Sequence, residues 1–284
     1  MCSLSTAEAE TLVLGLINDE PRQAIECFTP LSAYLEDHLA QQGIDQVEIT
    51  VLPDSEAMAT AIRDGEVDFY FDSPLVAAHV ARDSGAVPFL RRWKDGVGTY
   101  FSLIIVPSDS LASGLADLGG ATIGFEGPDS TSGYMLPAAM MHRSGLHPRP
   151  LLDDHQPQTD EIGYVFTHSD RNTVYWLARG MIDAAATDPR GWAWLEAAQP
   201  GAFRVLARSV HLPRNVVLHR PGMDSALVDE VATVLRHMED TSLGVEAMEA
   251  FFHTTRFDDF PLGREATFDP LFQLVDELDV MGLL

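Results

Sequence analysis

Lysine is almost absent from this sequence of 284 residues, and cations of any kind are scarce. Lys94 is the single lysine, and 18 Lys and Arg residues face 43 Asp and Glu residues, which gives a formal net charge of −25 at pH 7. Proteins that bind nucleic acid take much of their affinity from clustered cations that displace counterions from phosphates. Basic patches likewise recruit proteins to anionic membrane surfaces. The composition therefore excludes nucleic acid as a partner and argues against recruitment to a membrane surface.

Cysteines and long apolar runs are lacking as well. Cys2 and Cys27 provide neither a disulfide framework nor a metal-ligand spacing, and the histidines are not paired, so we expect no metal and no cofactor. No apolar run reaches the length of about 20 residues that spans a membrane, and no export signal precedes the first predicted strand. The chain is then either cytosolic or begins at a mature N-terminus, where Cys2 could carry a lipid anchor.

What the sequence does contain is a regular alternation of strands and amphipathic helices. Strands are predicted at residues 12–17, 47–52, 67–71, 99–106, 121–125, 163–166, 183–187, 203–209 and 216–218. Helices are predicted at residues 25–41, 57–63, 74–81, 131–143, 171–179 and 192–198, with amphipathic segments at 226–238, 245–252 and 267–278. This alternation predicts right-handed βαβ units and a mainly parallel sheet.

The order of these elements predicts an α/β protein of two lobes, with lobe two inserted into lobe one. Lobe one would comprise residues 1–103 and 207–284, and lobe two residues 104–206. Two crossing strands, near residues 100–106 and 203–209, would form the hinge. In such folds, ligands bind where the loops at the carboxyl ends of the strands converge, so we expect a cleft between the lobes.

Segment 125–134 carries the most specific signal. It leaves a predicted strand, turns through a Gly-Pro pair and presents three consecutive hydroxyls, Ser130, Thr131 and Ser132, where a helix begins. The first turn of a helix has unpaired N–H groups and a positive dipole end, so hydroxyl donors there complete a neutral cradle for an anion. Gly133 would let a ligand oxygen approach the backbone. The alternative is an ordinary helix cap with additional serines.

Several segments resemble the phosphate, phosphite and phosphonate solute-binding proteins of ABC transporters. The most specific match is segment 129–134, with Pro137 shortly after it. Further similar segments lie at residues 28–36, 67–74, 100–102, 117–120, 167–169 and 180–185. The resemblance covers roughly residues 10 to 260. It implies a two-lobed periplasmic binding protein of the type II fold, which would be periplasmic or lipid-anchored, monomeric and partnered by a permease.

The resemblance also implies a set of ligand-binding residues. In lobe two these are Ser130, Thr131, Ser132, Gly133 and His168, and Tyr100 would reach the ligand from the crossing strand. The phenol of Tyr100 and the imidazole of His168 would add donors to the oxyanion, and a protonated histidine would donate more strongly. In lobe one, Phe71, Ser73 and Ser55 would face the ligand.

Departures from the family pattern bear on the identity of the ligand. Family members that bind aminoalkylphosphonates surround the ammonium group with acidic side chains and an aromatic ring. Asp188 could supply one acid, but Asn215 stands at the second acidic position and Ser55 at the aromatic one. A neutral amide gives up a charge-assisted contact to a cation, which argues against an amine. Asp72 would repel a dianion if it faced the ligand, or it could simply cap the next helix.

An aromatic group in lobe two has two possible roles. Tyr175, Trp176, Trp192 and Trp194 cluster there, and the spacing of Trp176 with Arg179 and of Trp192 with Leu195 is typical of core faces. The aromatic rings could also form a platform for a ligand. Packing is the interpretation that the spacing favours.

Three functions from different classes are compatible with the sequence. The leading one is a binding protein that closes over a small phosphorus oxyanion and delivers it to an ABC transporter permease. The second is an enzyme on the same fold, in which Ser130, His168 and Asp188 would form a catalytic set. The third is a periplasmic partner that reports ligand occupancy to a signalling receptor. Consecutive hydroxyls suit anion binding better than a single activated nucleophile, so we expect no catalysis.

Overall fold

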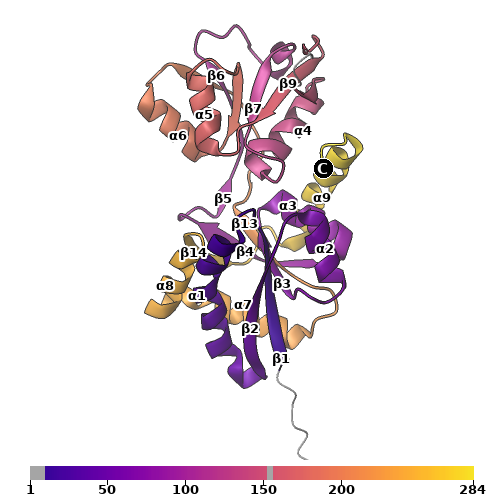
Figure 1. The fold of residues 1–284 in the computed structure, drawn as a ribbon, viewed down its shortest axis with the longest axis vertical. Helices are drawn as coiled ribbons and strands as arrows, with labels where there is room; N and C mark the ends of the chain where they lie inside the picture. The colour runs from indigo at the N-terminus through magenta and orange to yellow at the C-terminus, as the bar shows by residue number, and fades with distance from the viewer. Residues whose placement is uncertain (1–9, 152–155) are drawn as a thin grey trace, which may run out of the picture. The chain divides into compact units, whose positions relative to one another are not determined.

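The computed structural model describes residues 10–151 and 156–284, so Cys2 lies outside the described residues. The chain forms two units (Figure 1). Unit 1 comprises Met1–Thr99 and Pro213–Phe272, and unit 2 comprises Tyr100–Leu212 and Gln273–Leu284. The larger part of unit 2, Tyr100–Leu212, is therefore inserted in the sequence of unit 1, and the C-terminal segment Gln273–Leu284 is added to it after unit 1. Two short paired strands, β5 (Thr99–Tyr100) and β12 (Leu212–Pro213), stand where the chain passes from one unit to the other.

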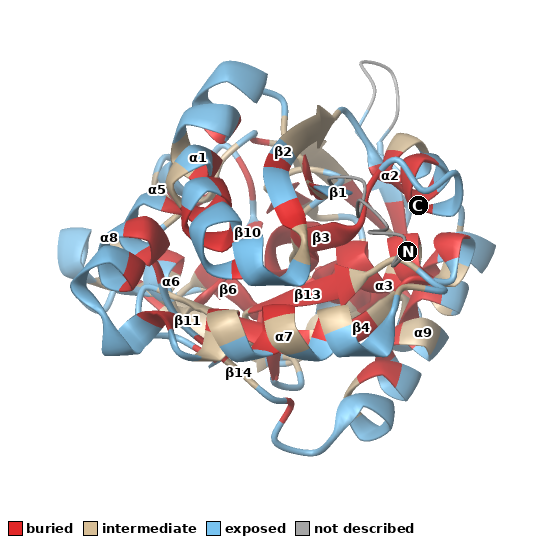
Figure 2. Cartoon of the chain, turned by 90° about the horizontal axis from the view of Figure 1, so that it is seen from below, coloured by how far each residue is buried: buried red, intermediate tan, exposed pale blue. Residues whose placement is uncertain are grey.

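Unit 1 is built on a mixed six-stranded sheet. In sheet order its strands are β14 (Thr254–Asp258), β4 (Val87–Lys94), β13 (Asn215–His219), β3 (Phe69–Asp72), β1 (Glu10–Ile17) and β2 (Ile44–Leu52). The strands β2, β1 and β3 are parallel, and β13 is antiparallel to both β3 and β4. The central strands β3 and β13 are almost entirely buried (Figure 2). The carboxyl ends of β3 and β4 therefore meet the start of β13 at one edge of the sheet.

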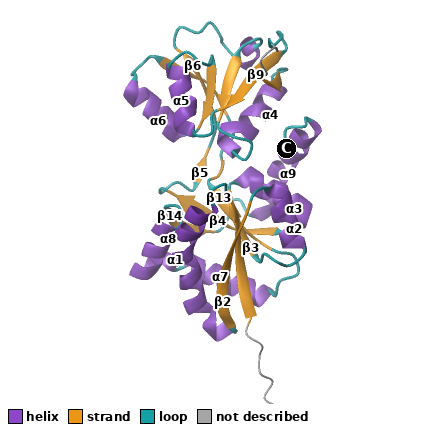
Figure 3. Cartoon of the chain, viewed as in Figure 1, coloured by secondary structure: helices purple, strands orange, loops and turns teal. Residues whose placement is uncertain are grey.

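Helices cover both faces of this sheet (Figure 3). They are α1 (Pro21–Leu39), α2 (Ser55–Arg63), α3 (Pro74–Ser84), α7 (Ser225–Arg236) and α8 (Ser242–Ala250), with short 3₁₀ turns at Ala40–Gln42 and Met238–Asp240. The helices α1, α7 and α8 share a hydrophobic core with the strands, in which Phe28 stacks on Phe251 at 4.4 Å between ring centroids. The last helix, α9 (Arg264–Val280), starts among unit 1 residues and ends among those of unit 2.

Unit 2 is built on a second six-stranded sheet. In sheet order its strands are β11 (Phe203–Arg208), β6 (Leu103–Pro107), β10 (Ala184–Thr187), β7 (Thr122–Phe125), β9 (Glu161–Phe166) and β8 (His147–Pro150). Its helices are α4 (Leu136–Arg143), α5 (Asp170–Ala178) and α6 (Pro189–Ala198), with a 3₁₀ turn at Leu115–Leu118 and a π-helical turn, η3, at Thr131–Met135. The helices α5 and α6 share a core with β6, β10 and β11, to which Trp176 and Trp192 contribute.

The alternation of strands and helices is confirmed, but four strands were not expected. They are β4, β8, β12 and β14. The sequence of β4 ends in Arg-Arg-Trp-Lys, which lacks the apolar alternation of a strand. The charge of Arg91 is neutralised inside the sheet, where its guanidinium donates to both carboxylate oxygens of Asp258 at 2.8 and 2.6 Å. The predicted helix at 131–143 is η3 followed by α4.

Among the described residues, no helix is both long and apolar enough to cross a membrane.

Candidate functional site

The hydroxyl-rich segment forms a tight turn directly after β7. Ser130 caps η3, and its Oγ accepts a hydrogen bond from the backbone N–H of Gly133 at 2.9 Å. The N–H groups of Tyr134 and Met135 both donate to the Ser130 carbonyl. Thr131 and Ser132 are buried, at 2% and 8% exposure. Because π turns are rare and concentrate at functional sites, this geometry marks the turn as more than a helix start.

Glu126 is part of this turn, although the sequence analysis did not select it. The Ser130 hydroxyl donates to Glu126 Oε2 at 2.6 Å, and the Glu126 N–H donates to the Gly133 carbonyl at 3.0 Å. Ser130 thus uses its proton on a carboxylate and its lone pair on a backbone amide. The sequence does show a carboxylate four residues before Ser130. It does not show the register of the turn, which brings Glu126 and Ser130 together.

Gly133 is required by the packing of this turn. A Cβ at this position would lie 2.6 Å from Glu126 Cβ and 2.8 Å from Ser130 Oγ. Real Cβ atoms do not approach other atoms so closely, because the overlap is strongly repulsive. The glycine therefore lets Glu126 and Ser130 approach each other, in addition to any role in admitting a ligand.

Two neighbouring segments hold the turn in place. The buried Ser102, just before β6, donates its hydroxyl proton to the Ser132 carbonyl at 2.6 Å. On the other side, the backbone N–H of His168 donates to the Glu126 carbonyl at 2.8 Å. His168 has a positive φ of 65°, which is uncommon for a residue with a side chain. The imidazole of His168 is exposed, while its backbone is held against the turn.

Asp188 lies at the carboxyl end of β10 and caps the next helix. It is 5% exposed, and its Oδ1 accepts hydrogen bonds from the N–H groups of Arg190 at 2.8 Å and Gly191 at 3.0 Å. These contacts satisfy two of the otherwise unpaired donors at the start of α6. Tyr100, also buried, belongs to β5 at the beginning of unit 2.

The residues expected from lobe one gather at the carboxyl edge of the unit 1 sheet. Ser55 is the first residue of α2, which Asp54 caps by accepting from the Ala57 N–H at 2.8 Å. Ser73 is the cap residue of α3. Phe71 packs edge-on against Phe28 and Phe251, with centroids 5.3 and 5.4 Å apart. Phe71 is therefore a residue of the aromatic core.

Asp72 is held by its own neighbours at this edge. Its carboxylate accepts from the Tyr70 hydroxyl and from the Ser73 N–H, each at 2.5 Å. Asp72 was considered either as a group facing the ligand or as a cap of the next helix. These contacts support a structural role at the start of α3.

A buried arginine, which the sequence analysis missed, lies beside Asn215. Arg92 is 5% exposed, pairs with Asn215 across β4 and β13, and stacks on Phe251 at 4.7 Å. Burial and the nearby Arg214 lower the pKa of Arg92 to about 9, against the raising effect of Asp72 and Asp95. In the part of the chain that the structure describes, Arg92 Nε and Asn215 Oδ1 lack hydrogen-bond partners. This edge thus carries buried positive charge where the sequence suggested only acids and amides.

The side chains of Ser130 and Asp188, two members of the catalytic set considered from the sequence, have other hydrogen-bond partners in unit 2. Ser130 donates to Glu126, and Asp188 accepts from backbone N–H groups of α6. Within residues 10–151 and 156–284, no group of three or more His, Cys, Asp or Glu side chains is placed to hold a metal ion.

Comparison with known proteins places this geometry in a family. Residues 14–260 match the model of the ABC transporter phosphonate periplasmic substrate-binding proteins, and the chain belongs to this family. Its fold is that of the two-lobed periplasmic binding proteins, as expected from the resemblance.

Solved structures share this fold. XAC2383 from Xanthomonas citri, bound to chloride, is similar with a TM-score of 0.85 and 29% identity, over 95% of this chain and 99% of that one. The structure of XAC2383 bound to ATP has a TM-score of 0.86 and 28% sequence identity, and the match covers 95% of this chain and 98% of that one. PhnD1 from Prochlorococcus marinus in complex with methylphosphonate has a TM-score of 0.67 and 14% identity, and the match covers 95% of this chain and 99% of that one. The periplasmic aliphatic sulphonate binding protein SsuA from Escherichia coli has a TM-score of 0.57 and 16% identity, and the match covers 97% of this chain and 88% of that one.

Proposed function

We propose that this protein captures a small phosphorus oxyanion and delivers it to the permease of an ABC transporter, without a chemical step. The observation that carries the proposal is the turn at Ser130–Gly133, which buries Thr131 and Ser132 at the end of β7 in a chain of the phosphonate-binding family. The protein would act as a monomer in the periplasm. Lobes of residues 1–103 with 207–284, and 104–206, would close on the ligand.

Neutral donors would provide the recognition. In the proposed site, Thr131, Tyr100 and the amide of Ser132 hold the oxyanion, and His168 adds its ring N–H. The Gly133 N–H donates to Ser130 Oγ and so supports the turn behind these donors. Hydrogen bonds to a charged acceptor are stronger than those between neutral groups, so a few buried donors suffice for a small anion. Lobe one would contribute Ser55, Ser73 and Asn215. Phe71, which packs in the aromatic core, and Asp188, which caps α6, would support the site without donating to the anion.

Glu126 gives this site a preference for ligands of low charge. Its carboxylate already accepts the Ser130 proton at 2.6 Å, so an oxyanion that binds Ser130 takes over a bond that the carboxylate now makes. An anion bound next to this carboxylate would be repelled by it, and the repulsion grows with the charge of the ligand. We therefore expect monoanions such as phosphite or methylphosphonate monoanion to bind better than dianionic phosphate.

The same observation favours a second candidate, a monoanionic sulfonate. A sulfonate presents three acceptor oxygens with a single negative charge, which suits a site beside a carboxylate. The sulphonate-binding neighbour shares the fold, and the ATP-bound neighbour suggests that larger phosphate esters belong in the same screen.

A thermal-shift screen distinguishes these ligands. The protein is heated with phosphate, phosphite, methylphosphonate, methanesulfonate or ATP, each at millimolar concentration. A ligand present at 100 times its Kd stabilises the folded state by about 2.7 kcal/mol, which raises the melting temperature by several degrees. We expect the largest shift with phosphite or methylphosphonate.

The variant Thr131→Ala serves as the test of the site, and Thr159→Ala as its matched control. Thr131 is buried in the turn, whereas Thr159 is exposed elsewhere in unit 2. We expect Thr131→Ala to lose most of the shift and Thr159→Ala to retain it. The proposal is wrong if no phosphorus oxyanion or sulfonate shifts the wild-type melting temperature.

A further inference from the structure

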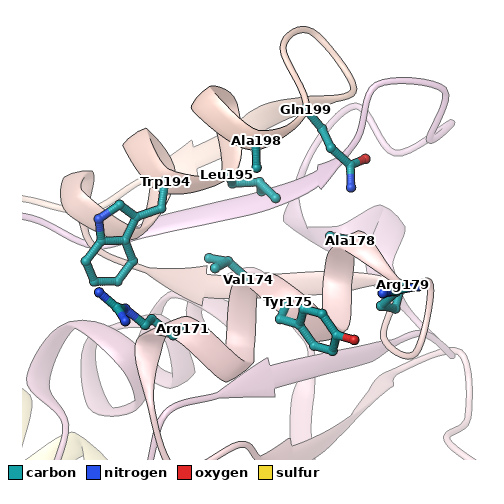
Figure 4. A pocket seen from close by; sticks show the side chains of 9 residues that line it. All are labelled: Arg171, Val174, Tyr175, Ala178, Arg179, Trp194, Leu195, Ala198 and Gln199. Carbon is teal, nitrogen blue, oxygen red and sulfur yellow. The ribbon is translucent and has the colours of Figure 1, made fainter.

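An open groove runs between helices α5 and α6 of unit 2, away from the η3 turn in the sequence. Its volume is about 540 Å³, and its floor is formed by the buried side chains of Val174 and Leu195 (Figure 4). Pockets for small organic ligands typically have volumes of about 300–1,000 Å³ and apolar floors. The groove is thus large enough for a ligand of that size.

Two aromatic residues line the groove rather than the core. Tyr175 is 53% exposed, and Trp194 lies across the groove from α5. Their neighbours Trp176 and Trp192 pack against the hydrophobic core of unit 2. Packing therefore accounts for two of the four aromatic residues, while Tyr175 and Trp194 present ring surface to the groove.

Each of these two rings has a guanidinium beside it. The Arg171 guanidinium carbon lies 5.0 Å from the centroid of Trp194, and that of Arg179 lies 5.1 Å from the centroid of Tyr175. Such stacking leaves the N–H donors at the guanidinium edge available for a carboxylate or sulfonate. Arg171 and Arg179 are eight residues apart, which corresponds to about 12 Å along a helix. One cationic group therefore stands at each end of the groove.

The charge of the groove contrasts with that of the whole chain. The protein carries 43 acidic residues, yet none lines the groove. In the part of the chain that is described, neither Arg171 nor Arg179 forms an ion pair, whereas Arg190 on α6 lies 3.7 Å from Asp170. Two unpaired arginines on an acidic protein create a local positive potential that attracts anions.

We propose that the α5–α6 groove is a second binding site, specific for a flat organic anion such as an aromatic carboxylate or sulfonate. The aromatic body lies on Val174, Leu195, the exposed ring of Tyr175 and the half-buried ring of Trp194, and the acidic group pairs with a guanidinium at one end. This site differs from the η3 turn in chemistry, because it combines apolar surface with arginine, whereas the turn offers neutral hydroxyls and amides.

The probe for the test is 1-anilinonaphthalene-8-sulfonate, whose fluorescence rises in an apolar environment. N-phenyl-1-naphthylamine, which has the same rings without the sulfonate, is the uncharged comparison. We expect saturable binding of one sulfonate probe per chain and at least tenfold weaker binding of the uncharged compound. Saturating methylphosphonate and the variant Thr131→Ala should leave the probe's affinity unchanged, because they act at the η3 turn.

Three variants locate the probe. The double variant Arg171→Gln/Arg179→Gln should weaken binding of the sulfonate probe by at least tenfold, the size of effect expected for a lost charge-assisted hydrogen bond. Ala198→Trp fills the groove without removing a charge and should also abolish binding. Arg149→Gln removes an exposed arginine elsewhere on unit 2 and should have no effect. Melting temperatures establish that each variant is folded.

The proposal is overturned by any of three results. They are the absence of saturable probe binding, equal binding of the charged and uncharged probes, and unchanged affinity in both the double variant and Ala198→Trp. If one of these variants does not fold, the other decides the outcome.

Discussion

Single residues in the η3 turn already carry much of the chemistry. The pair of Ser130 and Glu126 was not foreseen, because the sequence shows three hydroxyls but not which partner each of them meets. In the structure the Ser130 proton is directed to Glu126 at 2.6 Å. A carboxylate at this point makes charge, and not only shape, a basis for selecting the ligand.

The variant Glu126→Gln tests this role. Glutamine keeps an oxygen that can accept from Ser130 but removes the charge, so we expect anion affinity to rise by roughly fivefold, from about 1 kcal/mol of repulsion at a few ångströms. The gain should be larger for dianionic phosphate than for methanesulfonate. Titration calorimetry with both ligands measures it.

The matched control is Glu196→Gln, which removes one negative charge elsewhere in unit 2. It should leave both affinities unchanged. An unchanged or lower affinity for phosphate in Glu126→Gln would show that the carboxylate does not disfavour anions.

At the scale of elements, the alternation of strands and helices was predictable because apolar periodicity reports burial directly. Segments whose charges are neutralised by distant residues were not predictable. The strand β4 contains Arg91, which pairs with Asp258, and Arg92, which donates to Thr254 Oγ1 at 3.1 Å. Both partners lie more than 160 residues further along the chain, so no local pattern could indicate them. The π-helical register of η3 was likewise hidden, since it depends on hydrogen bonds and not on composition.

Helix α6 depends on its cap, which gives a prediction about stability. Asp188 Oδ1 accepts from the N–H groups of Arg190 and Gly191. Asp188→Ala leaves both donors without this partner and should reduce the free energy of unfolding by about 1–2 kcal/mol. Asp188→Asn retains the accepting oxygen, so its loss in the free energy of unfolding should be at most a small fraction of the loss in Asp188→Ala. Chemical denaturation followed by circular dichroism measures both, and equal losses in the two variants would contradict the capping role.

For the whole molecule, the net charge of −25 would set the conditions for the proposed capture of an anion. Like-charged partners repel over distances comparable to the Debye length, which is about 8 Å at physiological ionic strength and shorter at higher salt. The charge therefore does not exclude an anionic ligand, but it requires that recognition come from short-range hydrogen bonds.

The association rate should accordingly rise with salt. Between about 0.01 and 0.5 M ionic strength, we expect the rate constant for oxyanion binding to increase several-fold, because screening removes the repulsion. Stopped-flow tryptophan fluorescence measures the rate. Sodium acetate and sodium chloride at equal ionic strength separate screening from competition by chloride. A steep fall of the rate in both salts would indicate electrostatic attraction and contradict this account.

The central claim is that the η3 turn binds a small oxyanion, and isothermal titration of methylphosphonate into the wild-type protein and Thr131→Ala tests it most directly. We predict one ligand per wild-type chain, and a Kd at least tenfold weaker in Thr131→Ala while Thr159→Ala matches the wild type. Tight binding that survives unchanged in Thr131→Ala would place the ligand elsewhere and contradict the claim.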